Sequence, residues 1–562
     1  MAEVTIQQAF DRVLQHRQAG RGAEADALYR HILGQIPKEP NALNAFGILA
    51  QKAGQNEFAA DLFRRAIELA PLDAEFHDHL GMALAALGRW EEAAPSLERA
   101  MQLEPGAETC LNLAHALRRT GRSREAAARY RQAIDLQPNF PSAHNNLGNL
   151  LRENGQLEEA IASYQKALDL KPDYLEALNN LGSALLENGK PEQAISLYRR
   201  ALALRADVPE LHNNLGKALR ANGDGAGALA AHEKVLSLSP DHADAHWNRA
   251  LMLLLSGQFE QGWEEYEWRW QVPEFKSPRR KFSRHLWMGQ PLNGRRILLH
   301  AEQGFGDTIQ FCRYAPLVAA LGGRVILECP PELHRLLQSL PGVEELIASG
   351  QELPPFDLHC PLLSLPRALP TTLQNVPSAV SYLRPGPELI SRWKNRLEFP
   401  KDHLRIGINW AGSAANPNDR NRSIPLQTLA PLAQCPNALF YNLQTGPAAD
   451  QARSDSNAFA FVNQPLAFED FSDTAGLIAN LDLILSVDTA IVHLAGAMAA
   501  PVWALLPFAP DWRWLLGRQD SPWYPTMRLF RQPRVGDWDS VVQDAASELA
   551  QVIECVLKSA DG

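Results

Sequence analysis

An aspartate that could accept a proton stands where a glycine-rich loop turns into a helix-forming segment. Asp307 ends the loop EQGFGD, which contains Gly304 and Gly306, and the predicted helix begins at Asp307. A carboxylate in a partly dry cleft can have its pKa raised toward the range that proton transfer needs. The same residue is a favoured helix N-cap. His300, at the end of the preceding apolar run, is the second candidate base; the alternative is a packed strand-end residue.

A second group of residues could hold a phosphate. Ser486, Asp488, Thr489 and Ala490 lie where an apolar strand turns into a helix, and His493 follows one turn later. Free N–H groups and the helix dipole favour a phosphate oxygen at such a point, and Thr489 adds a hydroxyl donor. Asp488 is too negative for phosphate and would hold sugar hydroxyls or ribose. A plain capped helix explains the same residues.

Two arginines in a polar loop could neutralise a diphosphate. Arg420 and Arg422 follow another predicted strand, and Gln444 lies in the loop LQTGP after the next one. A leaving nucleoside diphosphate needs its charge neutralised, which arginine does well. The alternative is a solvated basic loop.

These residues need parallel sheets to bring them together. From Arg295 onward short apolar runs alternate with helix-forming segments, which predicts α/β halves at residues 295–400 and 401–562. We expect two Rossmann-like halves that face each other, with the ligand beyond the carboxyl ends of the strands. The loops that should line this cleft are EQGFGD, WAGSAANPNDRNRS, LQTGP and SVDTA.

The N-terminal half, residues 1–260, repeats with a period of about 34 residues, and a connector is expected at 261–294. Proline, alanine, glycine and aromatic residues recur in phase, as in Ala25, Tyr29 and Pro37 of the first unit. The small residues let paired helices approach, the aromatic residue fills the hole behind them, and the proline ends each unit. Such pairs stack into an α-solenoid. Units are predicted to begin near Ile6, Pro40, Ala74, Ala107, Pro141, Tyr174, Pro209 and Ala243.

One asparagine series follows the same period on the first helix of each unit, which lines the concave face. An amide there can grip the backbone of an extended peptide, because it donates and accepts at once. The alternative is an amide that only bonds between neighbouring helices. The series is Asn112, Asn146, Asn180, Asn214 and Asn248.

The repeats resemble the tetratricopeptide repeat, and the second half resembles the heptosyltransferase-like glycosyltransferases. SVDTAIVHLAGAMAAPVWALLP is similar to their donor-site signature, and GFGDTIQF to their N-terminal GD motif. With DRNRSIPL, FDLHCPLLSLP and NLQTGPA, the chain resembles bacterial proteins that join such repeats to such a transferase. The architecture is also similar to O-GlcNAc transferase and to repeat-bearing flagellin glycosyltransferases.

The resemblance implies a GT-B fold, a nucleotide-sugar donor as co-substrate, inversion at the anomeric carbon, no other cofactor and no metal. It implies that Asp307 is the general base and that Arg422 faces the donor phosphates. Two positions depart from the related sequences, which often have lysine where this chain has Pro417 and Thr445. Both departures remove positive charge near the expected phosphates.

The composition excludes several classes of protein. Lys and Arg number 54 against 64 Asp and Glu, a net charge of −10, which argues against a nucleic-acid binder. No stretch approaches the length of a membrane span, and six scattered cysteines fit a reducing compartment. We therefore expect a cytoplasmic glycosyltransferase that selects a protein acceptor, flagellin-like or other, with its repeats. The alternatives are a scaffold whose transferase fold has lost its chemistry, and a transferase acting on a glycan or lipid-linked acceptor.

Overall fold

The computed structural model describes residues 24, 39–273, 275, 277, 279–378, 381–397, 402–414, 416, 418–454, 459–462 and 468–560. The chain divides into two compact units, residues 1–188 and 189–562. The repeat predicted near Ile6, with Ala25, Tyr29 and Pro37, lies outside the described residues, as does Pro417.

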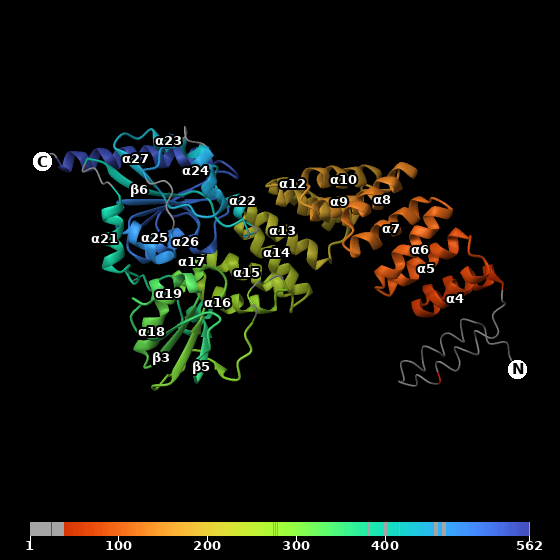
Figure 1. Ribbon diagram of the computed structural model, residues 1–562, viewed down its shortest axis with the longest axis horizontal. Coiled ribbons are helices and arrows are strands. Elements are labelled where there is room, and N and C mark those ends of the chain that lie inside the picture. Colours follow the sequence, from red (N-terminus) through yellow and green to blue (C-terminus); the bar gives the residue numbers. More distant parts are fainter. Residues whose placement is uncertain are drawn as a thin grey trace. The chain divides into compact units, whose positions relative to one another are not determined.

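Consecutive helices fill the described part of the first unit (Figure 1). The first helix of each pair begins at, or one residue from, the position that the repeat period predicts. The helices are α3 (Pro40–Lys52), α4 (Asn56–Leu69), α5 (Ala74–Ala86), α6 (Trp90–Leu103), α7 (Ala107–Arg119), α8 (Ser123–Leu136), α9 (Pro141–Glu153), α10 (Leu157–Leu170) and α11 (Leu175–Glu187).

Close contact between paired helices depends on the glycine series. A Cβ atom built on Gly148 would lie 2.6 Å from Cε1 of Tyr164, and one on Gly47 would lie 2.4 Å from Cε1 of Phe63. Tyr164 and Phe63 are fully buried. The aromatic residue therefore fills the space that the missing glycine side chain leaves, as the sequence predicts.

The second unit begins with the last repeat helices (Figure 1). They end in a short 3-10 helix that lies inside the predicted connector, 261–294. This segment also contains strand β1 (His285–Leu286), so it is not simply a connector. The helices are α12 (Pro191–Leu204), α13 (Pro209–Ala221), α14 (Gly225–Leu238), α15 (Ala243–Leu255), α16 (Phe259–Tyr266) and η1 (Glu267–Gln271).

Five described strands form the first parallel sheet, in the order β1-β5-β2-β3-β4. The order reverses between β2 and β5, where His300 pairs with Pro361. The further elements of this part are β2 (Arg296–His300), α17 (Phe305–Phe311), η2 (Cys312–Tyr314), α18 (Ala315–Ala320), β3 (Arg324–Cys329), α19 (Pro331–Leu337), β4 (Val343–Ala348), β5 (Leu358–Pro361), η3 (Leu362–Ser364), α20 (Leu365–Ala368) and α21 (Pro387–Arg396).

The second parallel sheet has the order β10-β9-β8-β6-β7 and reverses between β6 and β8. Its register pairs Asn409 with Ser486. The elements are β6 (Leu404–Asn409), α22 (Asp419–Arg422), η4 (Leu426–Leu429), α23 (Ala430–Ala433), β7 (Ala438–Asn442), η5 (Pro447–Asp450), α24 (Gln451–Ser454), α25 (Phe471–Ile478), β8 (Leu483–Val487), α26 (Ala490–Ala497), β9 (Val502–Leu506), η6 (Trp512–Trp514), β10 (Met527–Arg531) and α27 (Trp538–Ala560).

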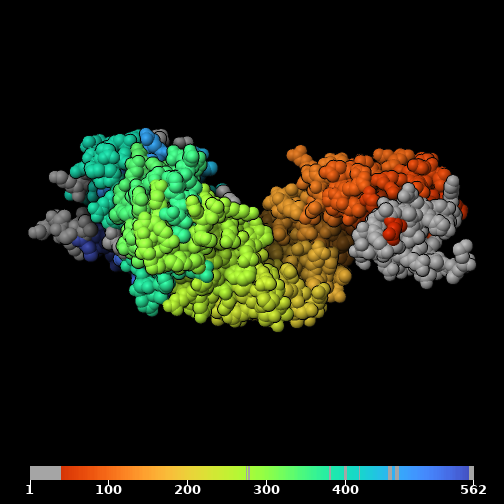
Figure 2. Space-filling view, turned by 90° about the horizontal axis from the view of Figure 1, so that it is seen from below, coloured from red at the N-terminus to blue at the C-terminus, as the bar shows by residue number. Residues whose placement is uncertain are grey.

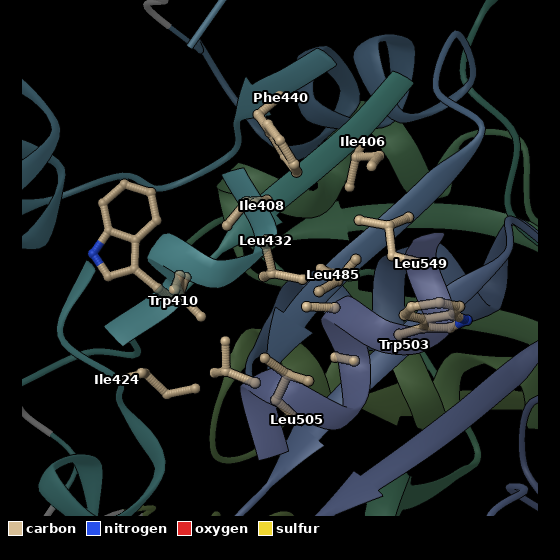
Figure 3. Packing of buried hydrophobic residues seen from close by; sticks show 14 of the residues in the cluster. Ile406, Ile408, Trp410, Ile424, Leu432, Phe440, Leu485, Trp503, Leu505 and Leu549 are labelled. Carbon is tan, nitrogen blue, oxygen red and sulfur yellow. The ribbon is translucent and has the colours of Figure 1, made fainter. Parts of the chain in front are cut away.

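A buried apolar cluster holds the second sheet together (Figure 3). Ile406 and Ile408 of β6 are at most 1% exposed and lie beside Leu485 of β8 and Leu549 of α27. Runs that are apolar on both faces are typical of parallel strands covered by helices. This packing fixes the carboxyl ends of β6, β8 and β9 at one edge of the sheet, where ligands bind in such folds.

Candidate functional site

Asp307 does not cap its helix, which begins two residues earlier than predicted. Gly304 is the N-cap of α17, and Asp307 is the third helical residue. Its Oδ2 atom reaches back and accepts the N–H of Gly304 at 2.8 Å. A carboxylate at this position satisfies a free N–H of the first turn. Asp307 therefore still stabilises the start of the helix, but as its third residue and not as the N-cap.

The other oxygen of Asp307 is held by an arginine from the second sheet. Arg513 of η6, which follows β9, donates Nη2 to Asp307 Oδ1. It also donates Nη1 to Asp511 at 2.9 Å and Nε to Gln310 at 2.6 Å, and its guanidinium carbon lies 4.3 Å from the ring centre of Trp512. The side chains of Arg513 and Asp307 are 9% and 17% exposed. The ends of β2 and β9 are therefore joined by a nearly buried ion pair.

Two opposing effects set the charge of Asp307. Burial raises the pKa of its carboxyl above the ordinary value, and the neighbouring Arg513 lowers it. Burial has the larger effect, so the pKa of Asp307 stays above its ordinary value although the ion pair favours the charged carboxylate.

His300 lies on the face of the first sheet and packs against other rings. Its ring centre is 5.6 Å from those of Phe282 and His359, and the residue is 3% exposed. Burial, with smaller effects of His359 and Arg280, lowers the pKa of His300 to about 3. Such a weak base fits the packed strand-end interpretation better than a catalytic role.

The start of α26 is built by hydroxyl groups that bond inward. Thr489 is the N-cap and accepts the N–H of Ile491 at 3.3 Å. Thr489 Oγ1 and Ser486 Oγ donate to Oδ1 of Asn409 at 2.8 and 3.2 Å, and Ser486 is fully buried. Ser486 therefore braces β8 against β6, while Asp488, Thr489 and Ala490 keep part of their surface exposed.

Arg422 joins the loop after β6 to the start of α26. Its Nη1 donates to the backbone carbonyl of Asp488 at 2.9 Å, and its Nε lies 3.4 Å from Asp419 Oδ1. Arg420 is on the same short helix but exposed. The structure thus brings Arg422 to the predicted phosphate position and leaves Arg420 at the surface.

Gln444 has no free position on its amide. Oε1 accepts from Asn409 Nδ2 at 2.9 Å and from the N–H groups of Trp410 and Ala411 at 3.1 and 2.8 Å. Nε2 donates to the carbonyls of Ala411 and Thr445, both at 3.0 Å. Gln444 therefore ties two loops together, and its contact with a donor stays a prediction.

His493 is a neutral, packed residue. Nδ1 lies 2.9 Å from the hydroxyl of Tyr524, the ring stacks on Trp514, and burial together with Arg513 lowers the pKa well below the ordinary value. The predicted reach of His493 to a phosphate stays a prediction, and the lowered pKa favours a neutral ring in that contact.

Gly306 lets helix α17, which follows the first sheet's β2, contact helix α26, which follows the second sheet's β8. A Cβ atom built there would lie 2.8 Å from Cδ2 of His493 and 3.6 Å from Cα of Ala490. Only a residue without a side chain allows α17 and α26 to approach this closely. Asp307, Arg513, Arg422, Asp488 and Thr489 are hereafter called the candidate site.

Asp488 is an acid of the candidate site whose pKa is strongly raised. Burial, and then the charge of Asp511, raise the pKa of Asp488 to about 6, against the lowering effects of Arg422 and Arg513. An anion placed beside Asp488 would therefore meet less repulsion when that carboxyl is protonated.

Three members of the asparagine series make hydrogen bonds between neighbouring repeats. Asn180 Nδ2 donates to Asn145 Oδ1 at 3.0 Å, and Asn248 Nδ2 donates to Asn213 Oδ1 at 3.2 Å. A side-chain hydrogen bond from Asn112 lowers the pKa of Asp78, whose burial raises it more. These contacts favour the interpretation that the amides tie successive first helices together.

In the part of the chain that the structure describes, no three His, Cys, Asp or Glu side chains gather as metal ligands would. Asp537-Trp538-Asp539 has the Asp-X-Asp spacing of some metal-dependent transferases, but Asp537 accepts the N–H of Ser540 at 3.2 Å at the start of α27. Among the described helices, none is both long and apolar enough to cross a membrane.

The sequence analysis missed Arg513, Asp511 and Tyr524. Arg513 and Asp511 lie in the segment that follows β9, one of the apolar runs in the alternating pattern after Arg295. Because the carboxyl ends of parallel strands share one edge, the segment PDWRW could have been added to the expected loops.

Comparisons with known proteins identify the repeats. Family models described as "TPR repeat" match residues 114–151 and 148–189, and models described as "Tetratricopeptide repeat" match 44–108, 179–241 and 213–266. "Protein FlbA" of Caulobacter vibrioides is 28% identical over 330 residues, which are 54% of this chain and 54% of FlbA. The chain thus spans about half the length of that curated relative.

Solved structures of repeat proteins are similar to part of the chain. The structure described as "Functional Characterization of Pseudomonas Aeruginosa pilF" is 20% identical, covering 36% of this chain and 91% of its own, with a TM-score of 0.32. The Cut9–Hcn1 hetero-tetramer structure is 17% identical, covering 47% and 52%, with a TM-score of 0.35. From the family models, the N-terminal region of this chain carries tetratricopeptide repeats.

Proposed function

We propose that the chain is a GT-B glycosyltransferase that moves a sugar from a nucleotide donor to a protein acceptor in the cytoplasm, with inversion and without a metal. The observation that carries this proposal is the meeting of the short helices that follow strands of both sheets: α17 after β2, α26 after β8 and η6 after β9. Asp307 after β2 is paired with Arg513 after β9, and Gly306 touches the start of α26. Two facing sheets with polar residues at their carboxyl ends suit a ligand held between them.

Each residue then has a role. Asp307 removes the proton from the acceptor hydroxyl as that oxygen attacks the anomeric carbon of the donor sugar. The bond from that carbon to the diphosphate breaks, and the leaving diphosphate gains the electron pair. Arg422 and the dipole at the start of α26 offset its charge, and Asp488 binds a hydroxyl of the sugar or ribose.

The repeats select the acceptor in this proposal. Repeats of this kind are typical of proteins that bind other proteins. In this proposal the asparagine series binds the acceptor peptide with the donor and acceptor groups that its bonds between repeats do not use. The series is Asn112, Asn146, Asn180, Asn214 and Asn248. An acceptor carried on a glycan or lipid is the alternative in which the repeats serve only assembly.

A scaffold without catalysis is the second candidate function, and two observations favour it. Both oxygens of Asp307 already have partners, and exposed Thr445 stands where related sequences often have lysine. A protein-binding scaffold needs only the repeats.

A binding screen separates the two functions. The purified full chain is heated with a panel of nucleotides and sugar nucleotides, and the Arg422→Ala variant is the matched control. A donor at 100 times its Kd stabilises the chain by about 2.7 kcal/mol. The transferase proposal expects at least one sugar nucleotide to raise the melting temperature of the wild type, and to do so less in the variant. No shift with any donor favours the scaffold.

A further inference from the structure

The last repeat helix, α16, contacts residues directly beside both members of the Asp307–Arg513 pair. The hydroxyl of Tyr266 at the end of α16 accepts the Nε2–H of Gln303 at 3.2 Å. Gln303 directly precedes Gly304, whose N–H binds Asp307. Tyr266 thus binds the side chain of the residue next to Gly304, whose backbone N–H orients the candidate base.

The same tyrosine contacts the neighbour of Arg513. The ring centre of Tyr266 is 6.2 Å from that of Trp512, and the ring centre of Trp263, also of α16, is 5.2 Å from it. Trp263 is anchored in turn, because its Nε1 donates to the carbonyl of Thr371 at 3.1 Å. Tyr266 and Trp263 are each 2% exposed. Rigid aromatic contacts therefore hold η6 against α16.

Both loops have a backbone that needs such support. Gln303 has a φ of +62° and Leu515, just after η6, has a φ of +53°. Residues other than glycine reach this left-handed region at a cost, and the surrounding contacts must maintain it. The bond from Gln303 to Tyr266 and the packing of Trp512 on α16 supply such contacts on both sides of the ion pair.

The turn between α13 and α14 also contacts the segment between β9 and η6. A Cβ atom on Gly223, in the turn between α13 and α14, would lie 2.8 Å from Cε1 of Phe508. Figure 2 shows the yellow-green atoms of the last repeats directly against the green atoms of the first sheet's half. The last repeats are thus packed on the site-bearing loops.

We propose that Tyr266 is a positioning residue, through which the last repeat sets the geometry of Asp307 and Arg513. This inference rests on the proposed function, because it gives Asp307 the role of the base. Tyr266 touches no reacting atom; it acts through Gln303 on one side and through Trp512 on the other. A displacement of 1 Å at a reacting group can cost about 100-fold in rate, so a single lost bond is measurable.

The test compares two tyrosine hydroxyls in the full chain. Tyr266→Phe removes the bond to Gln303 and keeps the ring. Tyr164→Phe is the control, because the hydroxyl of Tyr164 donates to Asn149 at 2.7 Å in an earlier repeat. We expect Tyr266→Phe to lower kcat about 10-fold with the donor KM unchanged, and to move the acid limb of the kcat profile to higher pH. Tyr164→Phe should do neither. A kcat and a pH profile within twofold of wild type for Tyr266→Phe would overturn the inference.

A second measurement separates this inference from the proposed function, because it needs no activity. Melting temperatures are compared for Tyr266→Phe, Asp307→Asn and the double variant, and for the same cycle with Tyr164→Phe. If Tyr266 positions the pair, the double variant falls by less than the sum of the single shifts, while the Tyr164 cycle is additive. Coupling without any sugar turnover would reject the transferase and keep the positioning role; additive shifts in both cycles would reject the positioning role.

Discussion

Asp307 is the residue on which the proposed chemistry depends, and its surroundings define how it could act. One oxygen is fixed by the N–H of Gly304 and the other by Arg513. An acceptor hydroxyl must therefore approach a carboxylate whose orientation is already set. The arginine favours the charged carboxylate and opposes part of the rise in pKa that burial gives to Asp307.

Asp307→Asn should abolish transfer and leave donor binding intact. Asparagine keeps the size of the side chain and an oxygen for the N–H of Gly304, but it cannot take a proton. A general base contributes about 10²–10⁴-fold to the rate, so kcat should fall by that factor. The measurement is kcat together with the donor Kd. Transfer at a near wild-type rate would leave Asp307 with only a structural role.

Arg422→Ala should weaken the donor instead. A charged hydrogen bond contributes about 1.5–3 kcal/mol, so the donor Kd should rise roughly 10- to 100-fold. Arg420→Ala is the matched control, because Arg420 lies on the same short helix but is exposed. Titration calorimetry with a sugar nucleotide compares the two. Equal losses of affinity would mean that the phosphate does not lie at Arg422.

Asp488 should make stability depend on pH in an unusual direction. Its pKa rises from 3.8 to about 6 in the folded chain, mainly through burial, so the folded state binds the proton more tightly than the unfolded one. Its contribution to stability is therefore present below about pH 4 and is lost as the pH rises through about 6. Asp488→Asn should raise the melting temperature at pH 7.5 and change it less at pH 4.5. An equal shift at both values contradicts this.

The sequence predicted part of the candidate site, and the reasons for the misses are physical. Four of its residues follow strands, so the positions of the strand ends alone predict that they lie at the carboxyl edges of the sheets. These residues are Asp307, Arg422, Asp488 and Thr489. Whether an amide or imidazole faces a ligand depends on side-chain packing, which strand ends do not reveal. The bonds that Gln444 and His493 make within the protein were not foreseen for that reason. Arg513 was missed because its partner, Asp307, lies 206 residues away in the sequence.

At the scale of elements, strong periodicity was the reliable signal. The repeat period predicted the starts of α3, α5, α7, α9, α13 and α15, because glycine and aromatic positions recur wherever two helices must touch. The apolar runs that precede the four predicted loops correspond to β2, β6, β7 and β8. The missed strands β1, β4 and β10 are short or partly exposed at the sheet edges, where burial does not demand a continuous apolar run.

Gly148→Ala should destabilise the first unit, although alanine usually favours a helix. Its Cβ atom would lie 2.6 Å from the ring of Tyr164, and overpacking of this kind typically costs about 1–3 kcal/mol. The check is the denaturation midpoint of the first unit's helices. Adding Tyr164→Ala should cost less in the Gly148→Ala background than in wild type, because the ring that clashes is gone. Strict additivity would show that the helices can separate without cost.

At the scale of the whole molecule, repeats and sheets are not independent modules in the second unit. The last repeat helices pack on the loops of the candidate site, so a cut at residue 260 would remove Trp263 and Tyr266 from the repeats they belong to. Sequence periodicity ends near that point, since α16 contacts non-repeating segments as well as the repeat helix α15. Protein binding by the repeats is therefore best tested in the full chain.

Metal removal should leave the activity unchanged. The proposed site offsets the diphosphate charge with Arg422 and backbone N–H groups at the start of α26, so it needs no divalent cation. Turnover of a sugar nucleotide is measured before and after treatment with EDTA, and again after adding Mg²⁺ or Mn²⁺. Activity that EDTA abolishes and either cation restores would contradict this and would direct attention to Asp537 and Asp539.

The most direct test of the transferase proposal is the release of nucleotide from a panel of sugar nucleotides by the purified full chain, with Asp307→Asn beside it. The proposal predicts that the wild type releases the nucleotide from at least one donor when acceptor protein is present, and that the variant binds this donor but releases it at least about 100-fold more slowly. Equal release by both proteins, or none by the wild type with any donor, would contradict the assignment and leave a protein-binding scaffold.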